Sequence, residues 1–270
     1  MTQKSIHPIF QTIIKSLSFV LAALSLSRAG VLMGQTVRQT FSDDGQLILT
    51  ENIDKKEEKS PKPLVDEDVI LIALAPDRSI FLADDRVNTG RKSVVFLAEV
   101  CLREGPLEFF ACTKNTKEHE SILATQAKPS LIHVGLLAIG AEPGTPVQFT
   151  PKFSPAAGPR IDITLRWLDK DGQRREAKAE EWVREMKSKK QMDTHWVFTG
   201  SMFKRLEGGK NQYVADATGE ILGVSNFPTV VLDVPIASTS DNNDLLFQAF
   251  TEKIPEEGTK ITVIMTLYKK

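Results

Sequence analysis

Two apolar-rich runs on either side of Gly105-Pro106 constrain the fold of this chain more than any other feature. They lie within residues 94–149, which hold both cysteines and two of the four histidines. A two-residue turn at Gly105-Pro106 would make a β-hairpin, because side chains alternate between the two faces of a strand. One face of this hairpin is then entirely apolar, with the residues Val100, Leu102, Leu107, Phe109 and Ala111. The pattern therefore predicts an antiparallel pair that covers a hydrophobic core.

The opposite face of the predicted hairpin carries both thiols, Cys101 and Cys112. With a two-residue turn they are diagonal neighbours about 7–8 Å apart, which is longer than a disulfide tolerates. A four-residue loop from Gly105 to Glu108 would instead place them opposite each other. The sequence leaves two alternatives open, a disulfide between Cys101 and Cys112 or two partly buried free thiols.

Strand and turn signals recur along the rest of the chain. Residues 69–76 and 79–85 predict a second hairpin, and residues 160–183 predict a third. Two strongly apolar segments, 131–140 and 244–253, predict short core helices. We therefore expect an α+β fold, mainly antiparallel strands and hairpins with a few short core helices.

An internal similarity predicts that the fold has two similar halves. Leu131 aligns with Leu245, and Gly144 aligns with Gly258, 114 positions later in both cases and without a gap. The matched segments would form a helix, a turn and a strand that the chain uses twice. The alternative is that both segments follow the common order of apolar helix, glycine turn and β-branched strand.

The N-terminus has the plan of a secretory signal peptide. Residues 17–26 form an apolar run of about ten residues, whereas a helix that spans a membrane needs about twenty. We expect residues 1–34 to be removed, and the alternative is an uncleaved N-terminal anchor. Residues 35–63 are polar and highly charged, which predicts a disordered spacer, and residues 64–270 then form one globular domain. The protein is thus expected to be exported, to the periplasm or to the medium.

The charge balance and the cysteine count argue against two classes of function. The chain has 34 Lys and Arg against 35 Asp and Glu, and no basic stripe with interleaved aromatic residues, so we expect no binding of nucleic acid. Two cysteines without a C-x-x-C spacing cannot ligate an iron–sulfur cluster. We expect no cofactor. The expected partner is an unidentified envelope or extracellular molecule, with membrane contact only through an uncleaved N-terminal segment.

One polar cluster could carry chemistry. His119 and Glu120 follow Cys112 by seven and eight residues, and Glu108 shares the strand face of Cys112. A loop that folds back would bring these four side chains together, and three protein ligands with one water would suit a zinc ion. The alternative is that the charges satisfy one another or nearby backbone N–H groups.

Five segments carry a family resemblance. They read LREGPLEFFACTKNTKEHESIL (102–123), HVGLLAIGAEPGTPV (133–147), HWVFTGSMF (195–203), GEILGVSNFPTVVLDVPIAS (219–238) and LLFQAFTEKIPEEGTKITV (245–263). Together they resemble the YdjY-domain proteins of bacteria and cover most of residues 64–270. The resemblance implies an exported bacterial domain of unassigned activity, and it supplies no catalytic residues.

These features lead us to expect a noncatalytic binding or structural role. An exposed apolar groove without converging polar side chains would favour this function. The alternative is a metal-dependent or thiol-based enzyme centred on Cys112 and His119, which a cleft joining the two side chains would favour. A redox-linked envelope partner is the third hypothesis, and the presence of only two cysteines argues against it.

Overall fold

The computed structural model describes residues 37–41, 47–51, 62–86, 88–238 and 245–269. The chain divides into two compact units, Met1–Glu58 and Lys59–Lys270. In the first unit, β1 (Val37–Phe41) and β2 (Leu47–Glu51) form an antiparallel pair. The predicted signal peptide lies outside the described residues, and the disorder expected of the spacer stays a prediction.

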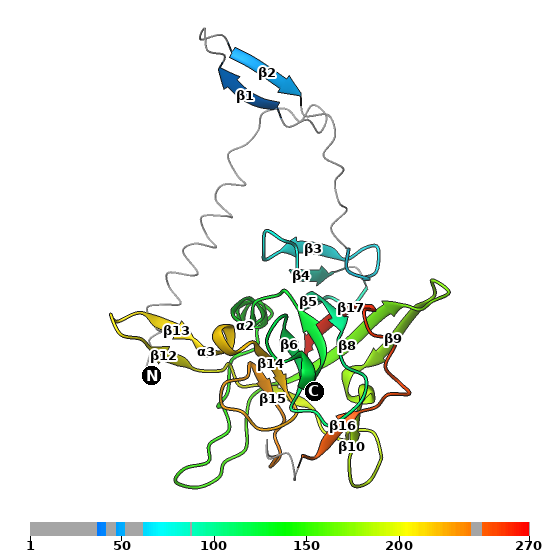
Figure 1. Ribbon diagram of the computed structural model, residues 1–270, viewed down its shortest axis with the longest axis vertical. Helices are drawn as coiled ribbons and strands as arrows, with labels where there is room; N and C mark the ends of the chain where they lie inside the picture. Colours follow the sequence, from blue (N-terminus) through cyan, green and yellow to red (C-terminus); the bar gives the residue numbers. More distant parts are fainter. Residues whose placement is uncertain (1–36, 42–46, 52–61, 87, 239–244, 270) are drawn as a thin grey trace. The chain divides into compact units, whose positions relative to one another are not determined.

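Eight strands of the second unit close into a barrel (Figure 1). Each strand pairs with the next around the barrel, and the last pairs with the first. The order is β5 (Arg91–Val100), β7 (Ser121–Thr125), β6 (Phe109–Thr113), β14 (Glu220–Gly223), β15 (Leu232–Asp233), β11 (Trp196–Phe198), β8 (Arg160–Leu168) and β17 (Lys260–Leu267). The pairs β6–β7 and β14–β15 are parallel, and the other pairs are antiparallel.

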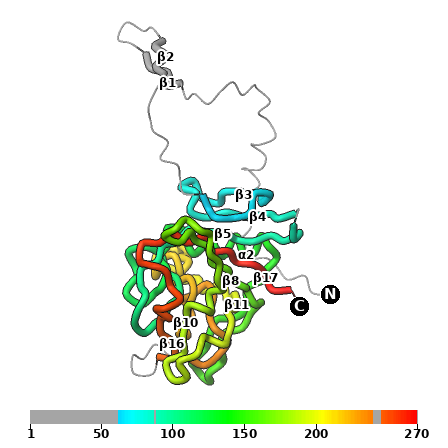
Figure 2. Tube along the Cα trace, turned by 90° about the vertical axis from the view of Figure 1, so that its right-hand side faces the viewer, coloured from blue at the N-terminus to red at the C-terminus, as the bar shows by residue number. Residues whose placement is uncertain are grey.

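The remaining elements surround the barrel. Strand β4 (Ile80–Asp85) pairs with β5 on one edge and with β3 (Ile70–Ala73) on the other, while β9 (Arg174–Lys178) pairs with β8. Two separate pairs are β10 (Val183–Glu185) with β16 (Phe247–Ala249) and β12 (Phe203–Arg205) with β13 (Asn211–Tyr213). The helices of the described part of this unit are α2 (Pro129–Ala138), α3 (Val214–Thr218) and the 3₁₀ turns η1 (Glu118–Glu120) and η2 (Ala179–Trp182). Figures 1 and 2 place β3–β4 and β10–β16 at opposite ends of this unit.

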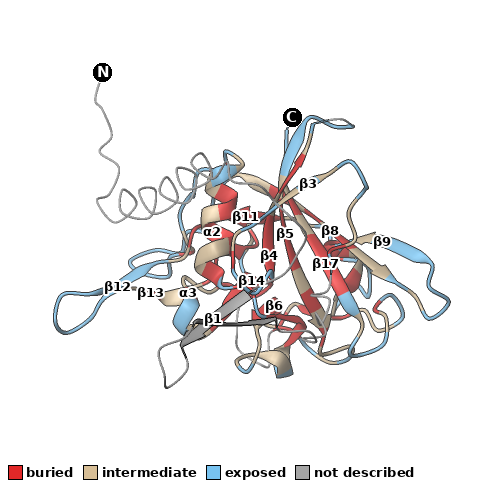
Figure 3. Cartoon of the chain, turned by 90° about the horizontal axis from the view of Figure 1, so that it is seen from above, coloured by how far each residue is buried: buried red, intermediate tan, exposed pale blue. Residues whose placement is uncertain are grey.

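Alternate apolar side chains fill the barrel, as the period of two in its strands requires. Val94 and Phe96 of β5, Ile163 and Leu165 of β8, and Val263 of β17 are at most 1% exposed. Figure 3 shows the buried segments of β5, β8 and β17 at the centre, with exposed hairpins around them. The predicted alternation marks the buried face of β8 correctly, whereas β6, β7 and β14 are buried on both faces, and in β6 it is Phe110 that packs against Trp196 in the core.

Helix α2 packs against β4 and β5. It begins at Pro129, whose fixed φ and missing N–H suit the first helical position, and the chain leaves it through Gly140 at φ 90°. Gly135 allows the close approach, because a Cβ there would lie 2.9 Å from Cγ2 of Val94. The helix predicted at residues 131–140 is confirmed. Within the described part of the chain, no helix is long and apolar enough to cross a membrane.

The expectation of an α+β fold is wrong, because the structure is a mainly β closed barrel. The two α-helices of the described residues are only 10 and 5 residues long. The second predicted helix, 244–253, is also wrong, since Phe247–Ala249 form strand β16. Phe247 and Ala249 are buried at alternate positions, and β16 pairs with β10. The periodicity of a short apolar segment does not distinguish a helix from a strand, and here the pairing with β10 makes the segment a strand.

The predicted pairing across Gly105-Pro106 is wrong as well. Strand β7 lies between β5 and β6, antiparallel to one and parallel to the other. The turn pairs instead with β16, because Leu107 N–H donates to Phe247 O and Ala249 N–H donates to Gly105 O.

The similarity of the two halves is not structural. Residues around Leu131 form α2, whereas the matching residues around Phe247 form strand β16. The same sequence pattern is therefore a helix in one half and a strand in the other. The hairpins predicted at residues 69–85 and 160–183 are confirmed as β3–β4 and β8–β9.

Candidate functional site

The barrel wall opens where β17 and β8 separate. Their antiparallel pairing runs from Leu267 opposite Ile161 to Thr262 opposite Arg166 and ends there. Strand β8 continues to Leu168, where it pairs with β9, while β17 starts at Lys260, where it pairs with β5. Both strands keep their other partners over this stretch, β9 for β8 and β5 for β17, so the opening lies where the β8–β17 ladder alone has ended.

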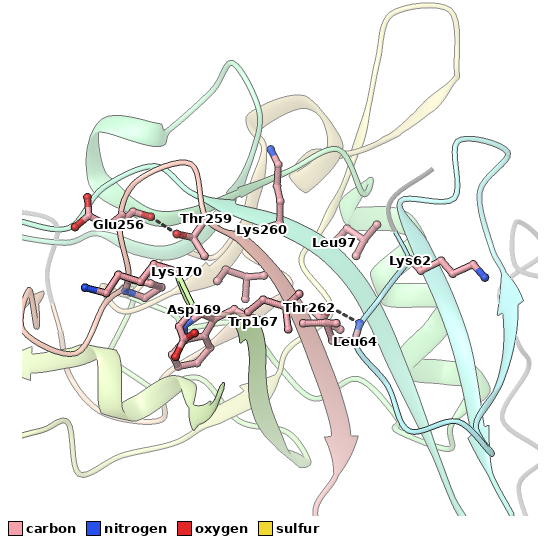
Figure 4. Close-up of a pocket in the computed structure, with 13 residues that line it drawn as sticks. Lys62, Leu64, Leu97, Trp167, Asp169, Lys170, Glu256, Thr259, Lys260 and Thr262 are labelled. Atoms are coloured by element: carbon pink, nitrogen blue, oxygen red, sulfur yellow. Dashed lines mark hydrogen bonds between the residues drawn. The ribbon is translucent and has the colours of Figure 1, made fainter. Parts of the chain in front are cut away.

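A groove of about 740 Å³ occupies this opening (Figure 4). We call it the seam groove. Its lining residues are Lys62, Leu64, Leu97, Trp167, Leu168, Asp169, Lys170, Pro255, Glu256, Thr259, Lys260, Ile261 and Thr262. In Figure 4 Lys170 and Glu256 lie at one end and Lys62 at the other, with Leu97, Leu64 and Trp167 between them. Charged side chains thus lie at both ends of the groove, and its middle combines these apolar side chains with Asp169, Lys260 and Thr262.

Most polar groups of the seam groove already have partners. Asp169 accepts hydrogen bonds from the N–H groups of Gln173 at 2.9 Å and Asp171 at 3.0 Å, and it pairs with Arg175 at 2.7 Å. These contacts, led by the backbone of Gln173, lower the pKa of Asp169. Thr262 Oγ1 accepts the N–H of Leu64 at 2.8 Å, which holds the chain before β3 against β17.

A smaller polar pocket of about 280 Å³ adjoins the seam groove and shares Leu97 and Lys260 with it. Glu99 lies in this pocket and pairs with both Lys260 and Lys114, the latter at 3.2 Å. The hydrogen bond from Lys260 is the main cause that lowers the pKa of Glu99. Together the two pockets make an elongated depression on the outside of β5 and β17.

The residues of the predicted cluster lie near η1, away from the seam groove. Glu108 and Glu120 are brought together, and Lys117 pairs with Glu120 at 2.9 Å. Burial, followed by the charge of Glu120, raises the pKa of Glu108 to about 7. The Glu108 carboxyl is therefore protonated in a large share of the molecules at neutral pH. Glu220, which β14 places opposite Cys112, adds further negative charge.

His119 and Cys112 have very different surroundings. The His119 side chain is 74% exposed, and its Nε2 lies 3.7 Å from Glu120. Cys112 is fully buried on β6, and burial raises the pKa of its thiol. Within the described residues, no three His, Cys, Asp or Glu side chains are grouped as a metal ion would require.

Both cysteines are free thiols. Cys101 follows β5 and Cys112 belongs to β6, so β7 runs between them. The Cys101 thiol donates to Ser121 O at 3.1 Å, and burial is the main cause that raises its pKa to about 12. A protonated, hydrogen-bonded thiol is a weak nucleophile at neutral pH.

A family model of the YdjY domain matches residues 86–266. The chain belongs to the YdjY-domain family. The YdjY domain begins just before β5 and ends one residue before the end of β17, so it coincides with the barrel. Strands β3 and β4 and the groove residues Lys62 and Leu64 precede it. No curated protein and no solved structure matches the chain significantly.

Sequence reasoning missed the seam groove of this YdjY-domain protein. Leu97, Trp167 and Lys260 are far apart in the chain, and only the pairing of β5, β17 and β8 brings them together. One signal was present. Leu168 breaks the alternation of β8 by following Trp167 with a second apolar side chain, and it is 49% exposed.

Proposed function

We propose that this protein is an exported, noncatalytic binding domain that holds a short extended peptide segment of an envelope or extracellular partner in its seam groove. The observation that carries the proposal is the open, apolar groove at the point where β17 and β8 separate. Exposed grooves of this size commonly serve as binding sites.

The strand edges in the opening favour a peptide. If the ladder of β17 and β8 continued, Lys260 would lie opposite Leu168, but their pairing ends two residues earlier. Backbone groups on these edges can take up an added strand, as in β-augmentation. The adjoining pocket at Leu97 and Lys260 lets such a strand continue along the outside of the barrel.

The openness of the groove also favours a peptide over an acyl chain. An extended peptide directs alternate side chains to opposite sides, so one side can cover Leu97 and Leu168 while the other faces water. An acyl chain in an open groove would leave half of its apolar surface in water. Because Lys170 and Glu256 give one end of the groove both signs of charge, we expect a peptide with little net charge.

The polar lining favours a noncatalytic role. Among the lining residues there is no cysteine, histidine or serine to act as a nucleophile or base. The carboxylate of Asp169 is held by Arg175 and two backbone N–H groups. Nothing observed at Cys112 and His119 favours the alternative of a thiol-based or metal-dependent enzyme.

The test is a selection of random nine-residue peptides, displayed on phage, against the full chain. Peptides with alternating apolar residues should be enriched, and their affinity can be measured by fluorescence polarisation. Leu168→Asp should weaken binding roughly tenfold or more, because a carboxylate would be buried against apolar groups. The matched control is Leu206→Asp, at a leucine that is 40% exposed on the loop after β12, and it should leave the affinity unchanged.

Tryptophan fluorescence is a second readout, which distinguishes a peptide bound in the seam groove from one bound elsewhere on the protein. Trp167 lines the groove, whereas Trp182 and Trp196 are fully buried, so a bound peptide should change the tryptophan fluorescence through Trp167, whose ring contacts that of Trp182, with centroids 5.3 Å apart. Trp167→Phe should abolish the change. The proposal fails if no peptide is enriched, or if enriched peptides bind Leu168→Asp as tightly as the unchanged protein.

A further inference from the structure

The β12–β13 hairpin projects from the barrel (Figures 1 and 3). It exposes apolar side chains together with cations. Its two strands form a sheet of their own, with Phe203 opposite Tyr213. Met202, Phe203 and Leu206 are 40%, 46% and 40% exposed. Single exposed apolar residues are ordinary on a protein surface, but three within five positions of one thin hairpin indicate a contact surface.

The charges on the hairpin have one predominant sign. Lys204, Arg205 and Lys210 are opposed only by Glu207, while the whole chain has a net charge of -1. Within the described residues, none of these three cations forms an ion pair. The hairpin is therefore a local positive site on a nearly neutral protein, and an anionic surface complements it.

The base of the hairpin is firmly anchored. Tyr213 is 8% exposed, and its hydroxyl lies 3.1 Å from Gly200 O and 3.0 Å from Nδ1 of His133 on α2. The ring of Tyr213 also contacts Phe203, with ring centroids 5.2 Å apart. The turn is closed by a hydrogen bond from Leu206 N–H to Lys210 O at 2.8 Å. Such a hairpin presents Leu206 and the cations in a fixed arrangement.

We propose that the β12–β13 hairpin docks this protein on an anionic lipid surface. Leu206, beside the turn, enters the interfacial region, and Lys204, Arg205 and Lys210 face the head groups. Met202 and Phe203 extend the apolar surface towards the base of the hairpin. A thin hairpin suits this role better than a flat protein interface, because insertion buries the tip from both sides. The proposal adds a membrane contact that is independent of the N-terminal segment and of the seam groove.

The test is co-sedimentation of the full chain with vesicles of 30% phosphatidylglycerol in phosphatidylcholine, and with pure phosphatidylcholine. Binding should be confined largely to the anionic vesicles and should weaken with added salt. Because each cation near such a surface contributes roughly fivefold, the double variant Lys204→Glu/Arg205→Glu should lose roughly 25-fold or more in partitioning. Leu206→Asp should lose roughly tenfold.

The matched control is Leu168→Asp, which changes a leucine that is 49% exposed on β8 and should leave partitioning unchanged. Leu168→Asp should thus weaken peptide binding but not vesicle binding, and Leu206→Asp should weaken vesicle binding but not peptide binding. Either proposal can therefore fail while the other stands. Circular dichroism should show that all variants fold, since every changed side chain is at least partly exposed. Failure of the unchanged protein to bind anionic vesicles overturns the proposal. Loss of binding in the charge variant but not in Leu206→Asp also overturns it, since adsorption by charge alone would explain that result.

Discussion

At the scale of single residues, His133 shows how burial sets the chemistry of a side chain. It belongs to α2, is 5% exposed and has Tyr213 Oη and Gly200 O within 3.1 Å of Nδ1. Burial lowers its pKa to about 4, so the imidazole is neutral at physiological pH. His133 is thus a core residue of the apolar helix α2.

The pH dependence of stability should therefore contain a contribution from His133. The unfolded chain takes up a proton there as the pH falls below about 6.5, whereas the folded protein resists protonation until about pH 4. The contribution is fully present above pH 6.5 and should be lost between pH 6.5 and 4, at a cost of about 3 kcal/mol. Urea unfolding at both pH values should show a smaller difference for His133→Gln. His119→Gln, at an exposed histidine, is the control and should behave as the unchanged protein; equal pH dependence in all three proteins would contradict the assignment.

The four residues of the predicted polar cluster differ in how far the sequence predicted their surroundings. Proximity in sequence correctly suggested that Glu108 and Glu120 could meet. It could not tell that Cys112 would be fully buried or that His119 would point into solvent, because both depend on how η1 packs over β6. The metal or thiol role of the cluster stays a prediction.

At the scale of elements, packing decided where composition was ambiguous. Helix α2 was predictable because its apolar run is bounded by Pro129 and Gly140. The apolar run around Phe247 has no such boundaries, and the free edge of β10 made it a strand. Short apolar segments therefore need their neighbours before their type can be assigned.

The contact of α2 with β5 can be tested at Gly135. Alanine normally stabilises a helix relative to glycine by up to about 1 kcal/mol, but a Cβ here would lie 2.9 Å from the stiff Val94 side chain. We expect Gly135→Ala to lower the free energy of unfolding by about 1–3 kcal/mol. In a Val94→Ala background the same change should cost little, and a double-mutant cycle measures the difference. A stabilised Gly135→Ala single variant would show that the helix is free to move away.

At the scale of the whole molecule, closure of the barrel determines the site. The closing pair is β17 with β5, two strands separated by most of the domain, and the groove lies where β17 leaves β8. The family match to residues 86–266 coincides with this barrel. A binding site on the outer wall of the barrel needs every strand from β5 to β17 in place before it exists.

Export is also a property of the whole molecule. We expect protein recovered from the envelope fraction to begin between Gly30 and Thr36, because small residues follow the apolar run at positions suited to signal cleavage. Sequencing of the N-terminus provides the measurement. Intact Met1 in the soluble cytoplasm would contradict export and remove the partner class proposed for the groove.

The sequence by itself determined the elements whose signals are local. Alternation identified the buried face of β8, turn residues identified the hairpins β3–β4 and β8–β9, and five motifs identified the family. Only the tertiary structure decided that β7 lies between β5 and β6, that the sheet closes, and that a groove opens beside Leu168. The physical reason is that strand pairing over long separations depends on which backbone edges meet, and a one-dimensional pattern of apolar residues does not specify those edges.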